Sequence, residues 1–153
     1  MPYIRLFYHI TWSTKIRLPL ITPDLEFNLF NYLVKKSSEI GCRILEVNGT
    51  EDHLHVIIEI PPKLSVSEAV KRLKGASSHE FSTLVWQRGY GAISVSERNI
   101  SAALEYVRNQ KDHHAQQTAI PRFERRDDEE MDNDSTVIKD EPGSYSADGD
   151  GLF

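Results

Sequence analysis

The spacing of apolar residues changes several times along the first 115 residues, and each change marks an expected element. Short stretches rich in aromatic and β-branched residues predict strands, whereas apolar residues three or four positions apart predict amphipathic helices. The pattern predicts strands at 3–15, 42–47, 53–60 and 92–95, and helices at 23–40, 66–84 and 97–114.

Helix-start and turn signals agree with these boundaries. Thr22 precedes Pro23 at the first helical position, Ser65 and Glu68 have the spacing of a capping box, and Ser96 precedes the last helix. Asn48-Gly49 reads as a turn between the second and third strands. The order β-α-β-β-α-β predicts an α+β, ferredoxin-like (RRM-like) antiparallel sheet with helices on one face and an added C-terminal helix.

The third strand has two chemically different faces, because side chains alternate in a strand. The apolar face must pack on the core helices, and the opposite face carries two imidazoles. A histidine pair at i, i+2 can chelate one divalent ion. Two half-exposed strand residues without a functional role would give the same pattern. The apolar face holds Leu54, Val56, Ile58 and Ile60, and the other holds His53, His55, Ile57 and Glu59.

The last helix carries a tyrosine and a glutamine one turn apart. Tyr106 and Gln110 are expected on a face about a quarter turn from a buried stripe. A glutamine oxygen can give a metal a third ligand, and a tyrosine can act as a nucleophile. A boundary aromatic beside a solvated amide would look the same. The expected stripe is Ile100, Leu104 and Val107, and Asn109 and His113 continue the Tyr106 face.

Charge divides the 153-residue chain into two parts. Residues 127–153 hold ten acids and Lys139, a net charge of −9, so residues 1–126, with 13 acids and 17 bases, carry +4. We expect one domain at 1–126 and an acidic, disordered tail at 127–153. The tail could compete with a polyanion for the basic body or act only as a solubilising segment.

With one cysteine, Cys42, no long apolar run and no signal-peptide pattern, we expect a cytoplasmic protein without a membrane span.

Several segments together resemble the HUH single-tyrosine transposases, which include insertion-sequence and REP-associated tyrosine transposases. The resemblance covers about residues 3–115. It rests on the segments Tyr-His-Ile-Thr-Trp-Ser-Thr-Lys at 8–15, Asn-Gly-Thr-Glu-Asp-His-Leu-His at 48–55, Val-Lys-Arg-Leu-Lys-Gly at 70–75, Trp-Gln-Arg-Gly-Tyr at 86–90 and Tyr-Val-Arg-Asn-Gln at 106–110.

The resemblance implies a function and a site. His53, His55 and Gln110 match the metal ligands of the family, and Tyr106 matches its nucleophile. It implies cleavage and rejoining of hairpin-bearing single-stranded DNA through a 5′-phosphotyrosine, by a homodimer. Two imidazoles and one amide oxygen form a mixed site with open positions for water and phosphate. Mg²⁺ or Mn²⁺ suits the phosphate chemistry, whereas zinc, which is possible on affinity, typically favours a closed tetrahedral set. Whether the sites form in cis or in trans, and whether the gene is mobile or host-retained, stays open.

Other functions share parts of this pattern. A histidine-triad enzyme needs a third alternating histidine, but position 57 is Ile. A relaxase or rolling-circle initiator shares the histidine pair and the tyrosine, but is often longer. The main alternative is a non-catalytic module that binds single-stranded nucleic acid on a ferredoxin-like sheet. Candidate DNA contacts are Lys63, Lys71, Arg72, Lys74, Arg88 and Tyr90.

Overall fold

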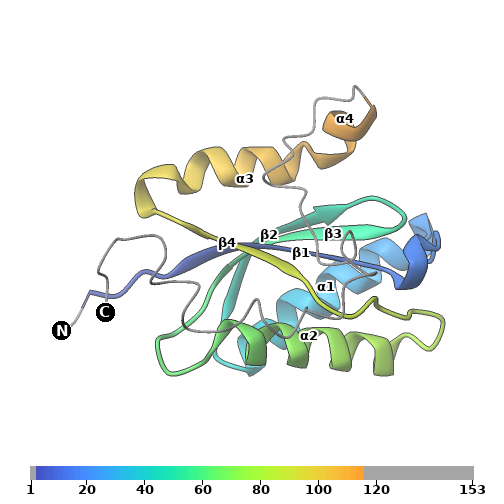
Figure 1. Cartoon of the computed structure of the whole chain (residues 1–153), viewed down its shortest axis with the longest axis horizontal. Helices are drawn as coiled ribbons and strands as arrows, with labels where there is room; N and C mark the ends of the chain where they lie inside the picture. The colour runs from blue at the N-terminus through green and yellow to red at the C-terminus, as the bar shows by residue number, and fades with distance from the viewer. Residues whose placement is uncertain (1–2, 116–153) are drawn as a thin grey trace.

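The computed structural model describes residues 3–115, and the acidic segment 127–153 lies outside this range. Helices and strands follow the predicted order (Figure 1). The strands are β1 (Phe7–Ser13), β2 (Arg43–Gly49), β3 (His53–Glu59) and β4 (Gly91–Val95). The helices are α1 (Pro23–Glu39), α2 (Val66–Glu80), α3 (Ile100–Arg108) and α4 (Gln110–Ala115), with 3₁₀ turns η1 (Lys15–Arg17) and η2 (Glu97–Asn99).

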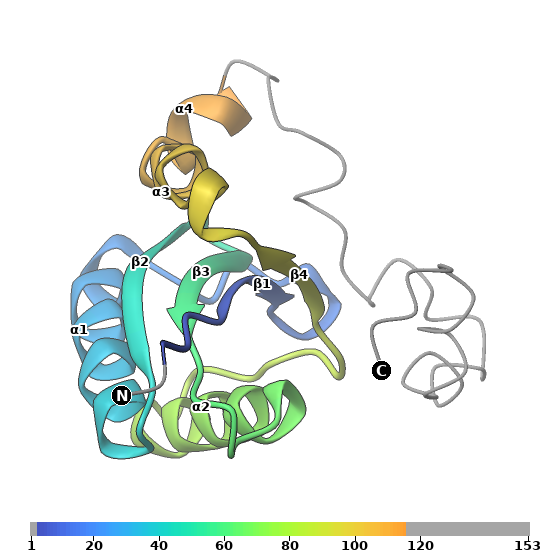
Figure 2. The ribbon, with the colours of Figure 1, turned by 90° about the vertical axis from the view of Figure 1, so that its left-hand side faces the viewer.

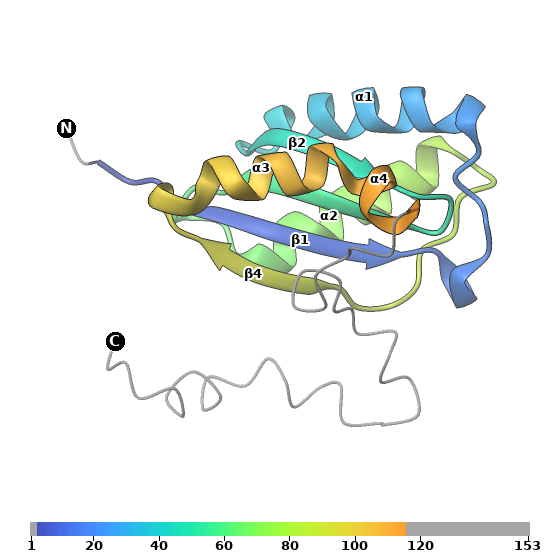
Figure 3. The same ribbon diagram turned by 90° about the horizontal axis from the view of Figure 1, so that it is seen from above.

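The four strands form one antiparallel sheet in the order β2-β3-β1-β4. Helices α1 and α2 cover one face of this sheet, and α3 and α4 lie over the other (Figures 2 and 3). This arrangement confirms the predicted α+β, ferredoxin-like fold with an added C-terminal helix. The sheet therefore has two buried faces, and only one of them belongs to the main core.

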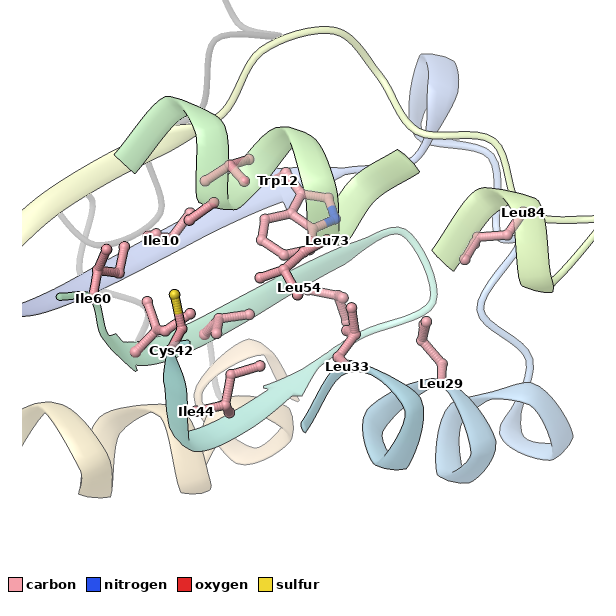
Figure 4. Packing of buried hydrophobic residues seen from close by; sticks show 14 of the residues in the cluster. Ile10, Trp12, Leu29, Leu33, Cys42, Ile44, Leu54, Ile60, Leu73 and Leu84 are labelled. Carbon is pink, nitrogen blue, oxygen red and sulfur yellow. The ribbon is translucent and has the colours of Figure 1, made fainter. Parts of the chain in front are cut away.

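The main core lies between the sheet and helices α1 and α2 (Figure 4). Even-numbered positions of β1 and β3 point into it, as the alternation predicted for β3. Their burial removes large apolar side chains from water and holds the odd-numbered positions on the opposite face. The most buried residues of this core include Ile10, Trp12, Leu29, Leu33, Leu54, Val56, Ile58 and Leu73.

The predicted helix caps are present. Thr22 Oγ1 accepts a hydrogen bond from the Leu25 N–H at 3.3 Å, and Ser65 Oγ accepts one from the Glu68 N–H at 3.1 Å. Ser96 Oγ accepts one from the Asn99 N–H at 3.2 Å. Each cap satisfies an N–H that the first turn of a helix leaves without an intrahelical partner.

The turn prediction at Asn48-Gly49 is wrong, because both residues belong to β2. β2 continues past the predicted end and pairs Asn48 with His55, and a β-bulge between Ile44 and Glu46 inserts one residue into the strand. A Cβ atom at Gly49 would lie 2.1 Å from the His53 carbonyl oxygen, so this close approach requires glycine. Gly49 is therefore required by the close approach of β2 and β3, and not by a turn.

Other predicted boundaries also change. The first strand starts at Phe7, and the second helix ends at Glu80, where Phe81 becomes extended. The predicted helix 97–114 is divided into η2, α3 and α4, with a break at Asn109 (φ −98°, ψ 21°). The sequence pattern could not show this break, because Tyr106 and Gln110 are four positions apart, as they would be on one continuous helix. Within residues 3–115, no helix is long and apolar enough to cross a membrane.

Candidate metal and tyrosine site

The sheet face opposite the main core carries the two histidines of β3 beneath α3. A second apolar cluster of Ile57, Ala103, Tyr106 and Val107 joins α3 to this face. His53 and His55 are 1% and 0% exposed, and Tyr106 and Gln110 are 5% and 0% exposed. The histidines thus lie away from the main core, as predicted, but they are fully covered.

The orientation of α3 on the sheet differs from the prediction. Tyr106 lies in the buried line of the helix with Ala103 and Val107, whereas Ile100 and Leu104 are only partly buried at its flanks. The helix therefore turns its tyrosine toward the polar sheet face instead of presenting it beside an apolar stripe. The ring centroid of Tyr106 lies 6.1 Å from that of His55, with an edge-on orientation.

His55 is paired with a third histidine, His9 of β1. The two residues share the same sheet face, and His9 Nε2 lies 2.8 Å from His55 Nδ1. His9 is 2% exposed, and its ring centroid also lies 6.1 Å from that of Tyr106. His9 was not assigned from the sequence. Its odd-numbered position in β1 was the available signal, but its neighbour could be identified only from the β1–β3 register.

His53 is oriented by polar residues of the loop before β3. Its Nδ1 lies 2.8 Å from Asp52 Oδ1 and 2.8 Å from Thr50 Oγ1. The Thr50 hydroxyl also donates to Asp52 Oδ1 at 3.1 Å, and Arg17 forms an ion pair with the carboxylate at 3.3 Å. Burial alone raises the pKa of Asp52, but hydrogen bonds from His53 and Arg17 and the charge of Arg17 outweigh it and hold this pKa well below its usual range.

These contacts decide which histidine nitrogens can bind a metal. An ionised Asp52 only accepts hydrogen bonds, so His53 Nδ1 donates to it, and Nε2 is the nitrogen through which His53 could bind a metal. In His55, Nδ1 is engaged with His9, so Nε2 is again the nitrogen that could bind a metal. A carboxylate or a similar group behind each ligating histidine is usual at protein metal sites.

The two histidines do not make a complete ligand set by themselves. Among residues 3–112, whose side chains the structure describes, no group of three or more His, Cys, Asp or Glu is placed to hold a metal ion. A metal at His53 and His55 would therefore need Gln110, water or substrate oxygen as further ligands. Gln110 is fully buried at the first position of α4, directly after the break that follows α3.

The loop that supplies Arg17 has unusual backbone angles. Ile16 and Arg17 have φ values of 46° and 57°, which are strained for residues other than glycine, most of all for β-branched Ile16. The Ile16 N–H donates to Gln87 Oε1 at 3.0 Å, and the Arg17 N–H donates to the Thr14 carbonyl at 3.0 Å. These contacts hold the loop so that Arg17 reaches Asp52.

The candidate DNA contacts predicted from the sequence are not gathered at this site. Lys63, Lys71, Arg72 and Lys74 lie on α2 or just before it, and α2 covers the opposite face of the sheet (Figure 2). Lys74 Nζ donates to the carbonyls of Gln87 and Gly89, both at 2.7 Å, and Arg72 pairs with Glu68. Arg88 is exposed, and Tyr90 packs against the main core.

Comparison with known proteins identifies the family of this chain. The family model described as "Transposase IS200 like" matches residues 3–110. The chain is 32% identical over 128 residues to the transposase for insertion sequence element IS200 of Salmonella typhimurium, covering 74% of this chain and 84% of the relative. It is 23% identical over 120 residues to the ISDra2 transposase TnpA of Deinococcus radiodurans, covering 71% and 86%.

The chain belongs to the IS200-like transposase family, and its process is DNA transposition. This confirms the resemblance seen in the sequence. Solved structures share the fold: a Deinococcus radiodurans R1 transposase has a TM-score of 0.58 and 24% identity, covering 71% of this chain and 93% of its own. A REP-associated tyrosine transposase bound to a REP hairpin also has a TM-score of 0.58, with 16% identity, covering 74% and 72%.

Proposed function

We propose that this transposase cleaves and rejoins single-stranded DNA, with Tyr106 as nucleophile and with His53, His55 and Gln110 as metal ligands. One observation carries the proposal. Tyr106, His53 and His55 are all buried, with ring centroids 5.1 Å apart for the two histidines and 6.1 Å apart for His55 and Tyr106. Nδ1 of His53 contacts Asp52 and Nδ1 of His55 contacts His9, which makes Nε2 the metal-binding atom of each ring in this proposal. A purely structural role does not require two imidazoles to be oriented in this way.

The residues of the chain provide the parts of a transesterification. Tyr106 Oη attacks the phosphorus of a DNA backbone phosphate and loses its proton as the new oxygen–phosphorus bond forms. The bond from phosphorus to the 3′ oxygen breaks, and this oxygen takes up a proton and leaves as a 3′-OH. The product is a 5′-phosphotyrosine that retains the ester. A second 3′-OH can therefore reverse the reaction and join strands without ATP.

The donor set fits a divalent ion that binds phosphate. Two imidazole nitrogens and one amide oxygen form a mixed site that leaves positions for water and phosphate oxygen. The phosphate oxygens are the ligands that favour Mg²⁺ or Mn²⁺ here. When bound, such an ion stabilises negative charge that develops on the phosphate. His53 and His55 would hold the ion from the strand, and Gln110 would reach it from the start of α4. Burial beneath α3 would exclude bulk water.

The non-catalytic alternative fits the structure less well. A nucleic-acid-binding module of the ferredoxin-like type stacks bases on aromatic residues of an open sheet face. Here α3 and α4 cover that face, and its central positions carry His9, His53 and His55 (Figure 3). The central strands β1 and β3 therefore offer no open aromatic platform on this face within the part of the chain that the structure describes.

Substrate and assembly follow from the same chemistry. Transfer between strands needs two cuts, and the described part of this chain places one tyrosine beside the histidines, so we propose a homodimer. The REP-associated structural neighbour is bound to a REP hairpin, and we propose hairpin-bearing single-stranded DNA as the substrate class here. In the single chain, Tyr106 lies next to His55 of the same chain.

The direct test of this function is a covalent adduct. The full-length protein is incubated with Mg²⁺ and an end-labelled single strand that contains a hairpin and its flanking sequence. We expect a protein–DNA product that survives boiling in denaturant and is lost in EDTA. Binding without any adduct, across a set of hairpins taken from the flanks of the gene, would favour the non-catalytic module.

A further prediction concerns Asp52, which orients His53. Replacing Asp52 with Ala removes the acceptor that keeps the proton on Nδ1, so we expect Mn²⁺ affinity to fall about 10- to 100-fold. Asp52→Asn keeps an acceptor oxygen and should fall between wild type and Ala. Isothermal titration with Mn²⁺ measures the order. Equal Mn²⁺ affinity in all three proteins would show that Asp52 stabilises the loop but does not affect metal binding by His53.

A further inference from the structure

The β-bulge of β2 changes which side chains of this strand reach the candidate site. Before the bulge, Ile44 points into the main core; after it, Val47 does so instead, opposite Val56. The inserted residue thus reverses the alternation, as expected for a period of two. As a result Asn48 points to the α3 side of the sheet, and its backbone pairs with His55.

The side chain of Asn48 contacts both sides of the break between α3 and α4. Its Nδ2 donates to the carbonyl of Arg108, the last residue of α3, at 3.0 Å. Its Oδ1 accepts from Lys111 Nζ at 2.8 Å, and also from the Gly49 N–H at 2.9 Å. Gln110 lies between these two contact points in the sequence, at the first position of α4.

Lys111 links the start of α4 to α1 and β2. Its Nζ donates to Glu26 Oε1 of α1 at 2.5 Å and to the Gly49 carbonyl at 3.1 Å, and it lies 5.8 Å from the centre of the Phe30 ring. The Lys111 side chain is 54% exposed, so its ion pair with Glu26 is expected to contribute little alone. Asn48 is partly buried, so it is the less exposed partner in its hydrogen bond with Lys111.

We propose that Asn48 is a positioning residue that fixes Gln110 relative to His55. Its backbone is tied to the strand position of His55, and its side chain holds the residues on both sides of Gln110. The role needs one donor and one acceptor on the same short side chain. An asparagine amide supplies both, whereas a carboxylate cannot donate to the Arg108 carbonyl. The proposal rests on the proposed function only where it takes Gln110 as a metal ligand.

The test compares Asn48→Asp with the matched change Asn31→Asp on the exposed side of α1. The carboxylate introduced by Asn48→Asp keeps the acceptor for Lys111 but replaces the donor to Arg108 with a charge that repels the carbonyl. The first measurement is the side-chain amide signal of Gln110 by NMR without metal, identified by its loss in Gln110→Ala. We expect fast exchange with water in Asn48→Asp, and the slow exchange of a buried amide in Asn31→Asp.

The second measurement is Mn²⁺ binding by titration in a double-mutant cycle. Asn48→Asp should weaken binding about 10-fold in the wild-type background and leave it unchanged in the Gln110→Ala background. Equal losses in both backgrounds would contradict the proposal, because a general structural defect acts without Gln110. Should Asn48→Asp fail to fold, Lys111→Met removes the other contact and is measured in the same way.

The two proposals can fail separately. An unchanged Gln110 amide signal in Asn48→Asp would overturn the positioning role, whatever metal binding shows. If wild type binds no Mn²⁺ but the amide signal responds as expected, the positioning role stands and the proposed metal chemistry is wrong.

Discussion

Tyr106→Phe is expected to abolish the covalent protein–DNA adduct completely. The substitution removes one oxygen, the atom proposed to bond to phosphorus, and leaves the ring that packs in the second cluster. DNA affinity and thermal stability should therefore stay close to wild type. Denaturing gel electrophoresis with labelled hairpin DNA measures the adduct, and fluorescence anisotropy measures binding under the same conditions.

Tyr32→Phe is the matched control for this experiment. Tyr32 lies on α1 at the opposite face of the sheet, and its hydroxyl donates to the Ala76 carbonyl at 3.3 Å. This variant loses the same oxygen and should form the adduct at the wild-type rate. An adduct that persists in Tyr106→Phe would assign the nucleophile to another residue and remove the main reason to place the reaction beneath α3.

His53→Ala and His55→Ala are each expected to lower the cleavage rate by about 10³-fold. A metal ion at a reacting phosphate contributes several kcal/mol, and about 4 kcal/mol corresponds to about 10³ in rate. Gln110→Ala should have a smaller effect, since water can replace an amide oxygen, and high Mn²⁺ should restore part of its rate. Single-turnover cleavage over a series of Mg²⁺ and Mn²⁺ concentrations measures all three variants.

His79→Ala serves as the control for histidine loss, because His79 is exposed on α2, away from the site. It should cleave as wild type does. Undiminished cleavage in EDTA, or in both β3 variants, would exclude a metal at His53 and His55. The tyrosine could then still act, and the histidines would have only a structural or proton-transfer role.

The residues most directly predicted by sequence were those whose position depends on local backbone geometry. The two faces of β3 follow from the strand period of two, so His53 and His55 could be separated from Leu54 and Val56 before any fold was known. Caps at Thr22, Ser65 and Ser96 are equally local. Tyr106 and Gln110 could be paired by helical spacing, and both are buried in the structure.

Contacts between distant segments were decided only by the tertiary structure. His9 was visible in the sequence, but only the β1–β3 register places its Nε2 beside His55 Nδ1. Asn48 was assigned to a turn because Asn-Gly favours turns locally, whereas strand pairing and the bulge place it in β2. The break at Asn109 is likewise stabilised by Asn48, 60 residues from Arg108 in the sequence. Local propensity contains no information about these partners, so sequence determined the reactive residue types and the fold determined how they are oriented.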